Sequence, residues 1–226
     1  MNNNDMRAVF AQRQKAEQNK KLNNYRQLNT FAKKGAVLFT GSSLMEQFPV
    51  SELCHSMDID AVVYNRGIGG YTTDDFLAGI GPMLLDLQPG KVFINIGTND
   101  IQDDPAIPEG WQAHLRNNYD AILGQLKAAV PACEVYVMAY YPVNADADCA
   151  KNGFMYAALQ VRTNAAVREA NAIAAELAEK YGYHYIDANA GLTDEQGRLK
   201  EEYTVDGVHM FPEAYAVVLE NLRPYI

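Results

Sequence analysis

Short hydrophobic segments rich in β-branched and aromatic residues recur at intervals along the chain. They lie at residues 36–39, 61–64, 91–96, 134–140 and 183–186. Nearly every position within each segment is apolar, which is typical of parallel strands that are covered on both faces. Longer stretches with helical patterns separate them. This alternation predicts an α/β fold, a three-layer α/β/α sandwich around a five-stranded parallel sheet with right-handed crossovers.

Four stretches carry helical patterns, at residues 72–87, 108–130, 154–181 and 212–222. The first begins at Thr72, a residue type favoured at helix N-caps, but Gly79 and Pro82 should kink or break this helix. Pro108 is suited to the first position of the second helix. Gly182 is a candidate to end the third helix in a left-handed conformation.

Residues 1–34 predict an N-terminal helical extension, packed on the domain that residues 35–226 form. The extension contains eight Lys or Arg residues and two Asp or Glu residues. Its apolar residues include Met6, Val9, Phe10, Leu22, Tyr25 and Leu28. A basic helix face of this kind is more often solvated surface than a membrane- or partner-binding face. The helix could pack on its own domain or on a second copy, which leaves a homodimer as one of two arrangements.

The composition argues against several classes of protein. The chain of 226 residues carries a net charge of −9, and no basic stripe with aromatics indicates nucleic acid as a partner. Cys54, Cys133 and Cys149 lack metal-site spacing, and their odd number argues against a disulfide framework. No secretory signal and no apolar stretch of membrane-spanning length is visible. We therefore expect a cytoplasmic protein without an integral membrane segment.

Residues that acyl-transfer chemistry uses follow the predicted strands. The first strand runs into Gly41, Ser42 and Ser43 at the C-terminal edge of the sheet, where ligands bind in open α/β folds. If Ser43 begins a helical turn, its own N–H points outward and can stabilise an oxyanion. The two hydroxyls could instead merely cap this turn. The segment by itself leaves both interpretations open.

Two further segments could supply donors to the same oxyanion. Glycines at 67, 69 and 70 permit a close backbone approach that brings the Gly70 N–H toward a substrate oxygen. Their spacing differs from the dinucleotide-binding fingerprint. Asn99 follows the third strand within a Gly-Thr-Asn-Asp segment, and its NH₂ group could donate as well. Both segments are also good turn sequences, and Asp100 could serve only as a cap of the next segment.

Asp206 and His209 are the strongest candidate pair. A separation of three residues lets the carboxylate meet one ring nitrogen of the histidine while the other faces a serine. An Asx-turn followed by a buried histidine is the structural alternative. Asp187, which ends the fifth strand, is the fallback for the acid. The remaining histidines have no metal-ligand partner at diagnostic spacing; these are His55, His114 and His184.

Taken in order, the four segments resemble the sequence blocks of the GDSL/SGNH hydrolase family of lipases and acylhydrolases. Residues 41–43 read Gly-Ser-Ser where the family has Gly-Asp-Ser, and residues 69–72 read Gly-Gly-Tyr-Thr where it has Gly-Gly-Asp-Thr. The third block and the final Asp-x-x-His are present at 97–100 and 206–209. The resemblance spans residues 36 to about 222. Ser42 and Tyr71 depart from the pattern, so the choice of Ser43 over Ser42 rests on alignment to the block.

The resemblance implies a flavodoxin-like sheet and a serine acylhydrolase. It implies Ser43 as the nucleophile, His209 as the base and Asp206 as the acid that orients His209. The implied oxyanion donors are the Ser43 amide, the Gly70 amide and the Asn99 side chain. No metal or organic cofactor is expected.

The expected substrate is a small-molecule ester with a short acyl chain or an acetyl group, such as a sugar acetate or a lysophospholipid-like ester. The polar stretch 144–148 is typical of a surface loop beside the site and suggests a hydrophilic leaving group. Two alternatives remain. One is an acyltransferase that uses the same serine, and the other is a non-catalytic module that binds carbohydrate or a protein partner.

Overall fold

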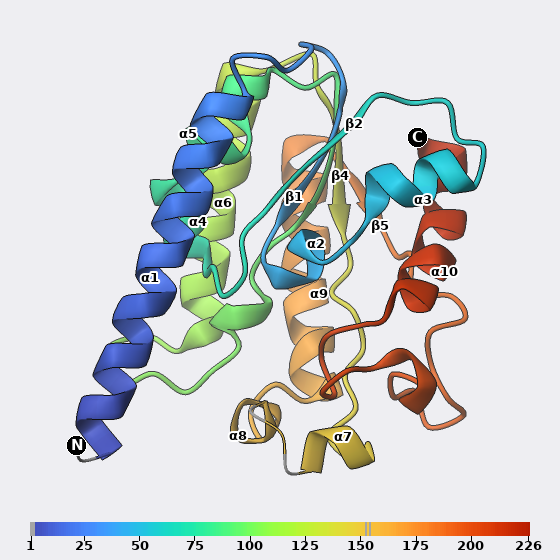
Figure 1. The fold of residues 1–226 in the computed structure, drawn as a ribbon. Coiled ribbons are helices and arrows are strands. Elements are labelled where there is room, and N and C mark those ends of the chain that lie inside the picture. The colour runs from blue at the N-terminus through green and yellow to red at the C-terminus, as the bar shows by residue number, and fades with distance from the viewer. Residues whose placement is uncertain (1–2, 152, 154) are drawn as a thin grey trace.

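The structure, a computed structural model, describes residues 3–151, 153 and 155–226. Its strands form one parallel sheet in the order β2-β1-β3-β4-β5 (Figure 1). They are β1 (Val37–Gly41), β2 (Val63–Gly67), β3 (Lys91–Asn95), β4 (Glu134–Met138) and β5 (His184–Ile186). This order confirms the flavodoxin-like α/β fold. The first two strands run further than predicted because Thr40, Asn65 and Arg66 pair within the ladder although they are polar.

Helices cover both faces of the sheet (Figure 1). They are α1 (Asn3–Leu28), α2 (Ser43–Glu46), α3 (Val50–Ser56), α4 (Thr73–Ala78), α5 (Ile80–Met83), α6 (Trp111–Ala129), α7 (Asp148–Lys151), α8 (Tyr156–Leu159), α9 (Asn164–Tyr181) and α10 (Pro212–Leu222). On one face α6 packs on α4 and α9 while α1 packs on α5, and on the other face α10 packs on α3. None of the helices in the described ranges combines the length and apolar character needed to cross a membrane.

The predicted helices are only partly confirmed. The stretch 72–87 breaks into α4, α5 and a 3₁₀ turn at Leu85–Leu87, as its glycines and proline predicted. The second helix begins at Trp111 and not at Pro108, because Gly110 before it has a φ of +82° that no helix continues through. The single helix predicted at 154–181 is wrong. Thr163 caps α9 by accepting from the Ala166 N–H at 3.2 Å, and α8 is a separate turn.

Two helix ends agree with the sequence. Gly182 ends α9 in the left-handed conformation, with φ +68°. Pro212 is the first residue of α10, where its missing N–H costs no helical hydrogen bond. The predicted start of the third helix, Phe154, lies outside the described residues.

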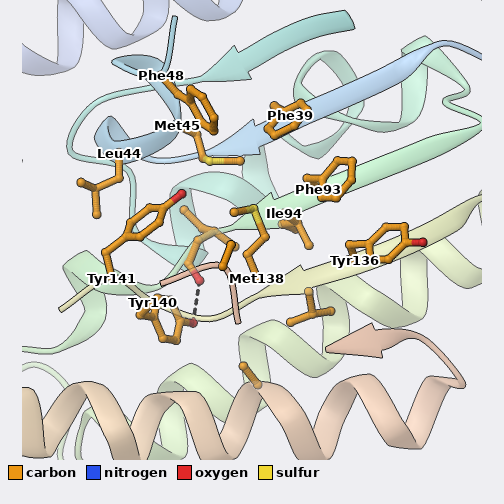
Figure 2. Close-up of a cluster of buried hydrophobic side chains, with 14 of the residues drawn as sticks. Phe39, Leu44, Met45, Phe48, Phe93, Ile94, Tyr136, Met138, Tyr140 and Tyr141 are labelled. Carbon is orange, nitrogen blue, oxygen red and sulfur yellow. Dashed lines mark hydrogen bonds between the residues drawn. The ribbon is translucent and has the colours of Figure 1, made fainter. Parts of the chain in front are cut away.

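A row of stacked rings crosses the sheet, and its members Phe39, Phe93 and Tyr136 are labelled in Figure 2. Phe39, Phe93, Tyr136 and His184 are register neighbours on β1, β3, β4 and β5. Their ring centroids are separated by 4.7, 4.8 and 4.9 Å. Phe48 meets Phe39 edge-on at 5.4 Å. Because the rings lock the strands side by side, they fix the carboxyl edge of the sheet at which the candidate residues stand.

Helix α1 docks on the domain through both polar and apolar side chains. The residues that face the domain are Gln18, Leu22, Tyr25 and Asn29, spaced at helical intervals. Gln18 and Asn29 are buried, whereas the predicted apolar residues Val9, Phe10 and Leu28 are exposed. Of the apolar residues named from the sequence, Leu22 and Tyr25 therefore lie on the docking face, where Gln18, Tyr25 and Asn29 also donate to backbone carbonyls. The predicted boundary between residues 34 and 35 stays a prediction.

Candidate active site

Ser43 stands at the carboxyl end of β1, next to the point where the strand order of the sheet reverses. Two residues before it only glycine fits, because a Cβ at Gly41 would lie 1.9 Å from the carbonyl oxygen of Asn95 on β3. The chain then turns at once into α2, where the Ser42 carbonyl accepts from the Glu46 N–H at 2.9 Å. As the first residue of α2, Ser43 has an N–H without a helical acceptor.

The side chains of Ser43, His209 and Asp206 form a continuous hydrogen-bonded chain. His209 Nε2 lies 2.9 Å from Ser43 Oγ, and His209 Nδ1 lies 2.7 Å from Asp206 Oδ2. Ser42 behaves differently, because its hydroxyl is fully buried and has no hydrogen-bond partner among the described residues. The structure therefore brings Ser43, rather than Ser42, to His209. The Ser42 side chain does not cap α2 either.

The loop before α10 holds His209 in place. Asp206 Oδ1 accepts from the N–H groups of Val208 at 3.0 Å and His209 at 2.8 Å, and Thr204 Oγ1 donates to the His209 carbonyl at 3.0 Å. Burial opposes ionisation of Asp206, but hydrogen bonds from the ring and backbone of His209 outweigh it and lower the pKa of the carboxyl. An ionised carboxylate at Nδ1 favours the tautomer whose Nε2 can accept a proton from Ser43.

The turn at Gly69 and Gly70 lies directly beside Ser43. A Cβ at Gly69 would be 3.7 Å from Ser43 Cβ, and Gly70 has a φ of +77°, in the left-handed region that favours glycine. The Gly69 N–H donates to Glu46 Oε2 at 2.5 Å, and the Gly69 carbonyl accepts from Gln18 Nε2 at 2.9 Å. Within the described residues the Gly70 N–H has no hydrogen-bond partner, so it is available to donate to a substrate oxygen.

Asn99 lies in a 3₁₀ turn after β3, and both ends of its amide are held. Its Nδ2 donates to the Tyr71 carbonyl at 3.0 Å, and its Oδ1 accepts from Arg162 Nη2 at 3.3 Å. An NH₂ group has two hydrogens, so one remains for a further acceptor. Because Tyr71 directly follows Gly70, the contact joins the second and third sequence segments.

A buried cation lies behind Asn99. The Arg162 side chain is 4% exposed, and its Nε has no partner among the described residues. Burial lowers the pKa of its guanidinium to about 10, although the carboxylates of Asp100 and Asp206 oppose the shift. Sequence reasoning missed Arg162, Gln18 and Glu46. No spacing pattern connects these residues to the segments they contact, so only the folded chain reveals them.

Two further residues named from the sequence, Asp187 and Asp100, make contacts other than the predicted ones. Asp187, the fallback acid, is exposed and accepts from the Asn189 N–H at 2.9 Å, whereas Asp206 pairs with His209. Asp100 does not cap the segment that follows it. Its buried carboxylate reaches back to α4 and accepts from the Thr73 N–H at 3.1 Å.

The polar stretch 144–148 does lie beside the candidate residues. The Asn144 N–H donates to the Gly207 carbonyl at 2.8 Å, but Asn144 itself is buried, so the stretch is not entirely surface. His114 is paired with Asp74 at 2.7 Å. In the part of the chain that the structure describes, no cluster of His, Cys, Asp and Glu side chains could hold a metal ion.

A parallel α/β sheet with a serine, a histidine and an aspartate at its carboxyl edge is typical of serine hydrolases. The sequence model of the GDSL-like Lipase/Acylhydrolase family matches residues 41–217. The chain belongs to this family of hydrolases, as its four sequence blocks indicated.

Solved structures are similar over most of the chain. A protein from Streptococcus pneumonia, provisionally described as a platelet activating factor, is 29% identical, with 99% of each chain covered and a TM-score of 0.85. A provisionally described acylhydrolase from Bacteroides fragilis is 24% identical over 89% of this chain and 93% of that chain, with a TM-score of 0.67. A catalytic mutant of an acetylxylan esterase from Geobacillus stearothermophilus is 16% identical over 85% and 94%, with a TM-score of 0.62. The comparison with curated proteins found no significant match.

Proposed function

We propose that the protein is a serine esterase that cleaves a small ester, with an acetyl or other short acyl group, through an acyl-enzyme. The observation that carries this proposal is the hydrogen-bonded chain from Ser43 Oγ through the His209 ring to Asp206. A serine hydroxyl is a weak nucleophile unless a neighbouring base takes its proton, and this geometry provides that base.

In the first step Ser43 Oγ attacks the ester carbonyl carbon while His209 Nε2 takes the hydroxyl proton. Asp206 stays ionised and stabilises the imidazolium that forms. Collapse of the tetrahedral intermediate breaks the ester C–O bond, and His209 returns the proton to the leaving alcohol. Water then attacks the acyl-Ser43 ester with His209 again as base, which releases the acid and restores the serine.

The negative charge on the tetrahedral oxygen requires donors that are fixed before the reaction. We assign this role to the Ser43 N–H, the Gly70 N–H and the side-chain amide of Asn99. Two structural facts support the assignment: the Ser43 N–H begins a helix, and the Gly70 N–H has no partner within the described residues. The chemistry requires no metal or organic cofactor.

The surroundings of the loop before α10 favour a polar leaving group. Asn144, whose N–H donates to the Gly207 carbonyl of this loop, also lines a polar hollow with Asp146, Arg198 and Glu201, although none of Ser43, Asp206 and His209 lines that hollow. The acetylxylan esterase that shares this fold is named for an acetyl ester of a carbohydrate. We therefore propose acetylated or short-chain esters of hydrophilic alcohols as the substrate class. All proposed groups come from one chain, so the reaction requires no second copy.

Labelling with a fluorophosphonate probe tests the proposal, because the probe reacts only with an activated serine. We expect the wild-type protein and Ser42→Ala to be labelled and Ser43→Ala to remain unlabelled. Ser42→Ala is the matched control, since it removes the neighbouring hydroxyl that does not contact His209. Hydrolysis of p-nitrophenyl acetate by Ser43→Ala should fall by about 10⁴–10⁶ in kcat.

Absence of both labelling and ester hydrolysis in folded wild-type protein would favour the non-catalytic binding module. Turnover that rises strongly when an alcohol acceptor is added would favour the acyltransferase. A fall of less than about tenfold for Ser43→Ala would contradict Ser43 as the nucleophile.

A further inference from the structure

Helix α1 lies directly over the turn that carries the Gly70 N–H. Gln18 Nε2 donates to the Gly69 carbonyl at 2.9 Å, and a Cβ at Gly70 would lie 2.3 Å from Gln14 Nε2. Gln18 is 6% exposed, so water competes little for this hydrogen bond. The helix runs antiparallel to β1, and its amino-terminal half lies toward the carboxyl edge of the sheet (Figure 1).

The Gly69 carbonyl and the Gly70 N–H belong to the same peptide group. A trans peptide is planar, and its C=O and N–H point in opposite directions. A donor that holds the carbonyl oxygen on the side of α1 therefore directs the Gly70 N–H away from α1. Rotation of this peptide is otherwise easy, because glycine on both sides of it permits many backbone conformations.

We propose that Gln18 of α1 is a positioning residue of the active site, which orients the Gly69–Gly70 peptide so that the Gly70 N–H faces the oxyanion. The inference rests on the esterase function proposed above. It gives the N-terminal helix a part in catalysis, although Gln18 lies outside the residues 41–217 that the family model matches.

A second contact from α1 holds the same turn from its other side. The Gly69 N–H donates to Glu46 Oε2 at 2.5 Å, and the other oxygen of Glu46 pairs with Lys21 of α1. Both backbone groups of Gly69 are thus tied to α1, one directly and one through Glu46. The two ties leave little freedom for the peptide that follows, which is what a preorganised donor requires.

Tyr25 provides a matched comparison on the same helix. Its hydroxyl donates to the Gly67 carbonyl at 2.6 Å, which is also a side-chain contact from α1 to the backbone of this segment. The Gly67 carbonyl shares its peptide with Ile68, however, and not with Gly70. Loss of the Tyr25 hydroxyl therefore weakens the docking of α1 without releasing the Gly70 N–H.

The experiment compares Gln18→Met and Gln18→Glu with Tyr25→Phe in the full chain. We expect kcat for p-nitrophenyl acetate to fall about tenfold to a hundredfold in both Gln18 variants, part of the 10²–10³ that loss of a whole oxyanion donor costs. KM should change little, and the fall in Tm should be similar in Gln18→Met and Tyr25→Phe, since each removes one hydrogen bond from α1 to a backbone carbonyl. Tyr25→Phe should retain kcat within about threefold. The ¹⁵N NMR shift of Gly70 should move in Gln18→Met and stay in Tyr25→Phe, since it reports the hydrogen bond at the carbonyl of its own peptide.

Three results would overturn the inference. Unchanged kcat in the Gln18 variants, with active wild-type protein, would show that the orientation of the peptide does not depend on Gln18. Equal losses of kcat and Tm in Gln18→Met and Tyr25→Phe would show that α1 acts only as a structural support. Wild-type protein that neither hydrolyses esters nor reacts with a fluorophosphonate would remove the esterase function itself, and the catalytic role of Gln18 with it.

Discussion

At the scale of single residues, the structure separates groups that react from groups that hold them. Asn99 and Arg162 illustrate the difference. The guanidinium of Arg162 donates to Asn99 Oδ1, so the NH₂ end of the amide faces the Tyr71 carbonyl. Burying a guanidinium is costly, and here the Asn99 amide and the charges of Asp100 and Asp206 offset part of that cost.

We expect Asn99→Ala to lower kcat by about 10²–10³, because it removes one donor to the oxyanion. Arg162→Met should lower kcat by about tenfold, since the amide keeps its donor but loses the contact that orients it. Added to Asn99→Ala, the Arg162 substitution should cause no further loss, because its target is gone. Steady-state kinetics of both single variants and the double variant measure this. Losses that multiply in the double variant would show that Arg162 acts on another group.

At the scale of elements, the ring stack ties the strands of the sheet together. Phe93 is fully buried between Phe39 at 4.7 Å and Tyr136 at 4.8 Å. Phe93→Ala should lower the free energy of unfolding by about 3–5 kcal/mol, because it removes the ring and leaves a cavity.

His184→Ala is the control for this substitution, since His184 ends the same stack at an exposed position. It should cost less than about 1 kcal/mol. Urea unfolding of both variants measures the difference. Similar losses in the free energy of unfolding for the two variants would mean that the stability of the stack does not depend on its central ring.

At the scale of the whole molecule, stability should depend on pH through Asp100. Burial raises the pKa of this carboxyl to about 6, although hydrogen bonds from Thr73 oppose the shift and the neighbouring charges of Asp74 and His114 act in opposite directions. The folded protein then holds the proton more tightly than the unfolded chain, whose ordinary value is near 3.8. The resulting stability is complete below the unfolded value and is lost as the pH rises through about 6.

Asp100→Asn isolates this effect, because it removes the titrating group and keeps the shape of the side chain. Relative to the variant, the wild-type protein should lose stability between about pH 4 and pH 7. Urea unfolding of both proteins across this range measures the difference in their free energies of unfolding. The contributions of the other carboxylates cancel in this difference. A difference that does not change with pH would contradict the raised pKa of Asp100.

Much of the fold could be predicted from the sequence because its determinants are local. The hydrophobic runs predicted the strands of a parallel sheet, and Gly79, Pro82, Gly182 and Pro212 predicted where helices break, end or begin. Glycine acts through the backbone dihedrals it permits, and proline through its fixed φ and its missing N–H donor. Both effects depend only on the local sequence. The order of Ser43, Asn99 and His209 along the chain, each near an edge of a predicted element, also sufficed to suggest the family.

The tertiary structure decided what depends on contacts between distant parts of the chain. It directed Ser43 rather than Ser42 toward His209, whose Nε2 lies 2.9 Å from Ser43 Oγ. It placed Gln18 on the Gly69 carbonyl and Arg162 on the Asn99 amide, across separations of 51 and 63 residues. No local pattern encodes such pairs, because a hydrogen bond between them exists only after the sheet has brought their backbones together. The sequence by itself thus determined the class of chemistry, and the fold determined which side chains hold its groups in position.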